Sequence, residues 1–144
     1  MSLPKFKLLP HIADALIIAY GKSLEEAFEN AALAMFEVMT ETKKVKPLVE
    51  DVVEVEGHDE QSLLYNWLET LLVKFELTGN LYSKFNVLNI ERTTKGFRLK
   101  AKIWGEPFNP ERHPQKVGVK AVTYHEMEIT KKPEAISVKF LLDL

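Results

Sequence analysis

Acidic side chains at two separate points of the chain carry the chemistry of a candidate metal site. Asp14 precedes an apolar, strand-like segment, and Asp143 stands directly before the terminal residue Leu144. Hard cations such as Ca²⁺ and Mg²⁺ take carboxylate and carbonyl oxygens as ligands. The carboxylates of Asp14 and Asp143 and the terminal carboxylate of Leu144 would repel one another if they came together without a cation. The residue types therefore fit a divalent-cation site, but spacing in the sequence fits a solvated chain end equally well.

A second candidate is the long connection over residues 105–120, which is rich in proline and in cationic side chains. Arg112, His113, Lys116 and Lys120 lie in this loop, and Glu111 is the only acid between positions 111 and 125. Long loops without periodicity are often functional. A cationic loop suits phosphate groups or an acidic partner. Lys120 alone also fits a simpler role, as an exposed lysine that discourages pairing at a strand edge.

The chain lacks the signatures of common enzyme classes. There is no cysteine, which excludes disulfides, thiolate zinc sites and cysteine nucleophiles. The four histidines, which include His11 and His125, lack zinc-binding spacing, and no GxSxG, P-loop or GxGxxG motif occurs. His11 and Asp14 form a His-x-x-Asp pair, for which a surface histidine and a turn cap are the simpler interpretation. We therefore do not expect the protein to be an enzyme.

The bulk composition is that of a soluble globular protein. The chain has 144 residues, of which 46% are hydrophobic and 28% charged, with a net charge of −2. No overall basic field favours nucleic acid. No stretch approaches the roughly 20 apolar residues of a membrane span, and the first residues lack a signal-peptide pattern. We expect one domain over residues 1–144, located in the cytoplasm and without membrane contact.

Hydrophobic periodicity predicts two helices. The first is expected over residues 23–39, where Ser23 and Glu26 form a capping box ahead of apolar residues at helical spacing. The second is expected to begin near Asp59 and to end at Gly79. Strands are predicted over residues 15–20, 49–57, 83–93, 96–106, 121–130 and 135–144. This order predicts a single α+β domain, with two helices packed on a largely antiparallel (mixed) β-sheet.

Four stretches of the chain together resemble the archease family. They read HIADALIIAYGKSLEEAFENAALAMFEVMT, YNWLETLLVKFE, GEPF…ERHPQKVGVKAVTYHEM and, at the end, FLLDL. The resemblance covers nearly the whole chain, in order and with similar spacing. It implies a small α+β protein that is a non-catalytic activator of the GTP-dependent, manganese-containing RNA ligase of tRNA splicing. Activation would promote guanylylation of the ligase and its multiple turnover.

The resemblance also implies roles for individual residues. Asp14 and Asp143 match the metal-binding aspartates of the family, with Leu144 offering main-chain or terminal oxygens to Ca²⁺, or to Mg²⁺ or Mn²⁺ in function. Lys120 matches the family's lysine in the KAVTY stretch. Four further residues match family positions: His11, Glu69, His113 and His125. Of these, His11, Glu69 and His125 are expected to support the site.

We therefore expect a divalent-cation site beside a surface that faces the partner or its phosphates. This surface comprises Lys120, His113, Lys116 and Arg112, and contact with RNA is expected to be indirect. An alternative is a chaperone or specificity modulator of a tRNA cytosine methyltransferase, in which the metal is purely structural. A third alternative, a free-standing metal-dependent enzyme, is not favoured because the sequence shows no general base beside the two carboxylates. Direct RNA binding lacks the interleaved aromatic residues of a single-strand platform.

Overall fold

The computed structural model describes residues 3–9 and 14–144, which form a single α+β domain. Within these described residues, seven strands, two long helices and one short 3₁₀ helix follow one another. Their bounds are β1 (Phe6–Leu9), β2 (Asp14–Gly21), α1 (Leu24–Met39), η1 (Thr42–Lys44), β3 (Val49–Gly57), α2 (Glu60–Thr78), β4 (Asn80–Thr93), β5 (Gly96–Pro107), β6 (Ala121–Lys131) and β7 (Ile136–Asp143). Both predicted helices and all six predicted strands are confirmed, whereas the four-residue β1 was not predicted.

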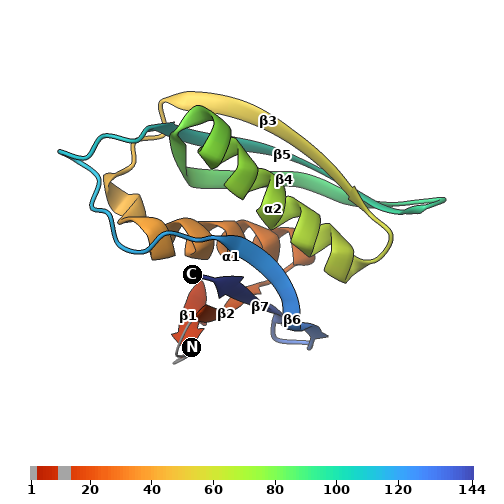
Figure 1. The fold of residues 1–144 in the computed structure, drawn as a ribbon. Helices are drawn as coiled ribbons and strands as arrows, with labels where there is room; N and C mark the ends of the chain where they lie inside the picture. Colours follow the sequence, from red (N-terminus) through yellow and green to blue (C-terminus); the bar gives the residue numbers. More distant parts are fainter. Residues whose placement is uncertain (1–2, 10–13) are drawn as a thin grey trace.

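The strands form two antiparallel sheets rather than one. A four-stranded sheet has the order β1-β2-β7-β6, and a three-stranded sheet has the order β3-β5-β4. The two helices lie between these sheets, as Figure 1 shows. Helix α1 contacts β2 and β7 on one side and β4 on the other, while α2 contacts β3 and β5 on one side and β6 on the other. The predicted α+β class, with two helices packed on largely antiparallel strands, is confirmed. The strands divide into two sheets, which spacing along the chain does not reveal because pairing depends on long-range contacts.

Helix α1 begins where the capping residues predict. The Ser23 side chain accepts a hydrogen bond from the Glu26 backbone N–H (3.1 Å), which satisfies a donor that the first helical turn leaves open. The Glu26 carboxylate accepts from the Lys22 N–H (2.8 Å), one residue earlier than in a standard capping box. Alanines are frequent on the buried surface of α1, and their small side chains let both sheets approach this helix: Ala27, Ala31, Ala32 and Ala34.

Helix α2 has a capping box at its start and a left-handed residue at its end. Asp59 accepts from the Ser62 N–H (2.7 Å), and the Ser62 hydroxyl accepts from the Asp59 N–H (3.1 Å). Gly79 ends the helix with φ 76°, a conformation that glycine adopts without a steric penalty. None of the helices in the described part of the chain is long and apolar enough to cross a membrane.

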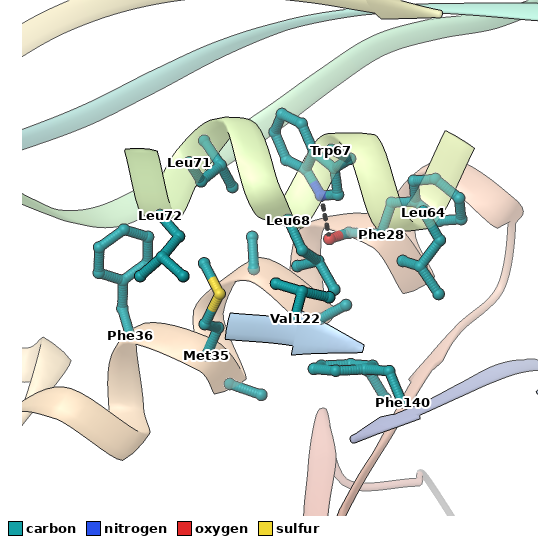
Figure 2. Close-up of a cluster of buried hydrophobic side chains, with 14 of the residues drawn as sticks. Phe28, Met35, Phe36, Leu64, Trp67, Leu68, Leu71, Leu72, Val122 and Phe140 are labelled. Atoms are coloured by element: carbon teal, nitrogen blue, oxygen red, sulfur yellow. Dashed lines mark hydrogen bonds between the residues drawn. The ribbon is translucent and has the colours of Figure 1, made fainter. Parts of the chain in front are cut away.

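The core fills the space where the two helices pack between the two sheets. Figure 2 shows Phe28 and Met35 of α1 beside Leu68 of α2, with Val122 and Phe140 approaching from the sheet. The indole N–H of Trp67 donates to the Phe28 carbonyl (2.9 Å), so this buried polar group has a partner. This core connects α1 and α2 with the four-stranded sheet, one end of which carries the candidate site.

Candidate functional site

The first residue of β2, the last of β7 and the first of β6 meet at one end of the four-stranded sheet. Strand β7 lies between β2 and β6, and Asp143 is the register partner of Asp14 on one side and of Ala121 on the other. The Lys120 N–H donates to the Asp143 carbonyl (2.7 Å). Three residues predicted from widely separated positions, Asp14, Lys120 and Asp143, are therefore neighbours in the fold.

The two aspartates occupy positions suited to binding one cation. Residues directly opposite in an antiparallel pair share a face of the sheet, with Cα atoms about 4.5–5.5 Å apart. Asp143 is exposed, while Asp14 is half-buried and its Oδ1 atom is fully buried. Like charges directly opposite one another destabilise a sheet. A cation held between the two carboxylates would offset this repulsion and would find the oxygen ligands that Ca²⁺, Mg²⁺ and Mn²⁺ prefer.

Leu144 and His11 bear on this site in different ways. Leu144 is partly buried and packs against the core, so the main-chain atoms that follow Asp143 are held next to the aspartates. His11 lies outside the described residues. Within residues 3–9 and 14–144 no group of three or more His, Asp or Glu side chains is arranged to hold a metal ion. Ligands from the described part of the chain would thus be two carboxylates and main-chain oxygens.

Lys120 is the cationic residue of the loop that remains exposed beside the aspartates. It directly precedes β6, and its side chain makes no hydrogen bond or ion pair with any other residue that the structure describes. An ammonium group in this position can move to meet a phosphate or carboxylate of another molecule. Lys120 therefore presents an exposed positive charge next to the two aspartates.

His113 lies in the interior, which differs from its predicted place on the partner-facing surface. Its side chain is 0% exposed. The Asn109 backbone N–H donates to Nδ1 of this ring (2.9 Å), so the ring proton is on Nε2, which faces Oε2 of Glu106 at 2.9 Å. The prediction was wrong because a histidine in a cationic loop can satisfy both ring nitrogens internally. Both ring nitrogens of His113 therefore bond within the loop and its base.

Glu106 organises the start of the same loop and was not recognised from the sequence. It is 3% exposed and receives hydrogen bonds from the Lys46 backbone N–H (2.7 Å) and from the Arg112 guanidinium. Burial alone would raise the pKa of Glu106, but hydrogen bonds from Arg112, Lys46 and His113 outweigh it and lower the pKa to about 2. The only signal in the sequence was an acid near the end of β5, six residues ahead of Arg112 and seven ahead of His113.

Lys116 also bonds within the protein rather than extending from the loop. Its ammonium group donates to the Glu37 carbonyl (2.8 Å) and to Oε2 of Glu37 (3.0 Å). Its backbone N–H donates to the Met39 carbonyl (3.0 Å), and the Val117 N–H donates to the Val38 carbonyl (3.3 Å). These carbonyls belong to the last turn of α1, which has no intrahelical donors for them. The loop is therefore the C-terminal cap of α1, and Lys116 and Arg112 are held in ion pairs.

Glu69 and His125 lie away from the aspartates. Glu69 is exposed on α2, where α2 packs beside β6. His125 is exposed on β6, four residues beyond Ala121, with Nε2 3.8 Å from Oε2 of Glu126. The structure does not bring either residue to the Asp14–Asp143 pair, so a supporting role at that pair has no geometric basis.

Comparison with known proteins identifies relatives over almost the entire chain. Residues 6–144 match the family described as the Archease protein family (MTH1598/TM1083). "Protein archease" of Sulfurisphaera tokodaii is 46% identical over 142 residues, which cover 99% of this chain and 100% of that protein. "Protein archease" of Pyrococcus abyssi is 51% identical over 124 residues, which cover 86% of this chain and 87% of that protein.

Two solved structures share the fold. The solution structure of Methanobacterium thermoautotrophicum protein 1598 superposes with a TM-score of 0.86 at 44% identity, covering 97% of this chain and 99% of that one. The crystal structure of a Thermotoga maritima protein described as "an archease, possible chaperone" superposes with a TM-score of 0.61 at 18% identity, covering 100% of this chain and 98% of that one. At this low identity the second comparison supports the fold alone.

Proposed function

Because the chain belongs to the archease family, we propose that it is a non-catalytic protein cofactor of the GTP-dependent, manganese-containing RNA ligase of tRNA splicing. It would promote guanylylation of the ligase and multiple turnover, acting in the cytoplasm and without direct RNA contact of its own. The observation that carries this proposal is the meeting of Asp14, Asp143 and Lys120 at one end of the four-stranded sheet.

The arrangement has the groups that an activator of nucleotidyl transfer needs. Asp14 and Asp143, with the main-chain oxygens of Leu144, would hold a divalent cation, Ca²⁺ or in function Mg²⁺ or Mn²⁺. When bound, the cation supplies positive charge that stabilises phosphate oxygens in phosphoryl and nucleotidyl transfer. Lys120 adds a mobile positive charge next to it. The buried Glu106–His113 pair and the cap on α1 keep the preceding loop in place, so Lys120 is presented from a fixed backbone.

The proposal is tested by following covalent guanylylation of the purified ligase with GTP and limiting Mn²⁺. We expect the protein to raise the rate, and Asp143→Asn and Lys120→Ala each to reduce the stimulation at least about tenfold, or about 1.4 kcal/mol. Matched controls are Glu111→Gln and Lys132→Ala, which change exposed side chains away from the pair. If both site variants stimulate the ligase as well as the unaltered protein does, the site assignment is wrong.

A second proposed function is that of a chaperone or specificity modulator of a tRNA cytosine methyltransferase. It is the alternative that the family resemblance leaves open, and the Thermotoga maritima protein of the same fold is described as a possible chaperone. In that case the cation would be purely structural. The protein would then keep the methyltransferase soluble or alter its product pattern with Lys120→Ala unchanged in effect, while ligase turnover would not respond to the protein at all.

A further inference from the structure

Strand β6 leaves its regular pairing in the middle of its length. Thr123 pairs with Leu141 and Glu128 with Lys139, so four residues of β6 lie opposite one residue of β7. Within this bulge Glu126 has φ 60°, a left-handed conformation that is uncommon outside glycine. A bulge redirects the side chains of its strand. Here it belongs to the segment that carries Tyr124.

The ring of Tyr124 lies flat against the ring of Tyr65 from α2. The ring centroids are 4.4 Å apart and the planes differ by 6°. Tyr124 is nevertheless 51% exposed, so a large part of this aromatic surface faces solvent. Stacking fixes the orientation of both rings between a helix and a strand. The result is a rigid aromatic surface that no described side chain covers completely.

Two carboxylates lie beside this stack. Glu69 is one helical turn beyond Tyr65 on α2, and Asp59 caps the start of that helix. Burial is the main cause that raises the pKa of Tyr124, and the charges of Asp59 and Glu69 add to it. His58 lies against Asp59, with Nε2 3.5 Å from Oδ2, and Lys131 pairs with Glu60 (2.7 Å). The charges that act on the Tyr124 ring are therefore those of the two carboxylates, Asp59 and Glu69.

An exposed aromatic face flanked by carboxylates selects a flat cation. A guanidinium stacks on an aromatic ring and also donates paired hydrogen bonds to a carboxylate. A nucleobase could stack in the same way, but its phosphate would meet the charges of Asp59 and Glu69. We propose that Tyr65, Tyr124, Asp59 and Glu69 form a binding site for an arginine side chain of a partner protein.

This site goes beyond the proposed function and does not depend on it. Lys120 and Tyr124 are four residues apart, about 13 Å of extended chain, so the aromatic surface is a contact point separate from the Asp14–Asp143 pair. Its ligand is defined by charge and shape, whichever protein supplies the arginine. A test with a small probe therefore needs neither the ligase nor a metal ion.

The experiment follows the ring resonances of the full-length protein by NMR during titration at constant ionic strength. The probes are N-acetyl-arginine amide, its neutral isostere N-acetyl-citrulline amide, and AMP. We expect saturable shifts of the Tyr65 and Tyr124 rings with the arginine probe, and at least about fivefold weaker binding of citrulline, as expected for a cation–π contact strengthened by charge. Equal binding of arginine and citrulline, no binding, or tighter binding of AMP would overturn the proposal.

Variants separate the aromatic and electrostatic parts of the site. Tyr124→Ala should remove the shifts of the Tyr65 ring, whereas Tyr124→Phe keeps the aromatic face and should retain binding within about twofold. Glu69→Gln should weaken the arginine probe and leave citrulline unchanged. Asp143→Asn should leave binding of the arginine probe unchanged. A failure of the arginine site can therefore be distinguished from a failure of the metal site. If Glu69→Gln binds arginine as tightly as the unaltered protein does, the carboxylate is not part of the site.

Discussion

Asp14 and Asp143 are direct register partners across the antiparallel pair of β2 and β7, although 128 positions separate them in the sequence. The pairing places both side chains on one face of the sheet. It also brings them next to Lys120, whose N–H binds the Asp143 carbonyl. This relationship converts two isolated acids into one candidate site.

We expect this pair to bind a divalent cation. Isothermal titration with Ca²⁺ and with Mn²⁺ should show one site, and Asp143→Asn should weaken it at least about tenfold because a carboxylate ligand becomes a neutral amide. The exposed loop residue Glu111 offers a control, since Glu111→Gln removes the same charge elsewhere. Equal affinity in Asp143→Asn and the unaltered protein would contradict the assignment.

Cation binding should also stabilise the fold. A ligand that binds only the folded state adds about 2.7 kcal/mol at a hundred times its Kd. Thermal unfolding with Ca²⁺ should therefore occur at a higher temperature than unfolding with a chelator. In Asp14→Asn the difference should shrink to that produced by matched ionic strength. A full cation-dependent shift in this variant would show that the ion binds elsewhere.

Glu106 should make stability depend on acid pH. Its pKa in the folded protein is about 2, against an ordinary value of 4.5. Because the folded value is the lower one, the stabilisation is fully present above about pH 5 and is lost as pH falls from about 5 towards 2, amounting to about 3 kcal/mol. Urea unfolding at pH 7, 4 and 3 should show this loss. Glu106→Gln should be less stable at pH 7 and should vary less over the same range.

Substitution of His113 should loosen the long loop. His113→Ala removes a donor to the buried Glu106 carboxylate and the acceptor of the Asn109 N–H, and it leaves a cavity. We expect a loss of about 2–4 kcal/mol in the free energy of unfolding. Hydrogen exchange of residues 109–117 should increase more than exchange in α2. If exchange rises equally throughout the protein, the histidine stabilises the fold globally and not the loop in particular.

Gly105 and Gly118, both in the segment of residues 105–120, differ in their tolerance of a side chain. A Cβ at Gly105 would collide with the Leu81 carbonyl on the neighbouring strand, so Gly105→Ala should destabilise the protein by about 3 kcal/mol or more. A Cβ at Gly118 meets no atom within 4 Å, so Gly118→Ala should be nearly neutral. Chemical unfolding of both variants measures the difference. Similar losses for the two would contradict the close strand approach at Gly105.

Much of the secondary structure was predictable because its signals are local. Ser23 and Asp59 start the helices with their own side chains, and Gly79 ends α2 with its own backbone freedom. Alternating polarity located β3, and the turn after Thr93 located the hairpin of β4 and β5. Each of these features depends on residues a few positions apart, so a sequence pattern contains the information.

The sequence by itself also determined which residues carry charge and which oxygens a cation could use. Only the tertiary structure decided that Asp14 faces Asp143, that the strands divide into two sheets, and that His113 is buried against Glu106. These outcomes depend on long-range register and on competition for burial among all elements at once. A local sequence pattern cannot predict them, because the free energy that decides them arises only when distant segments pack together.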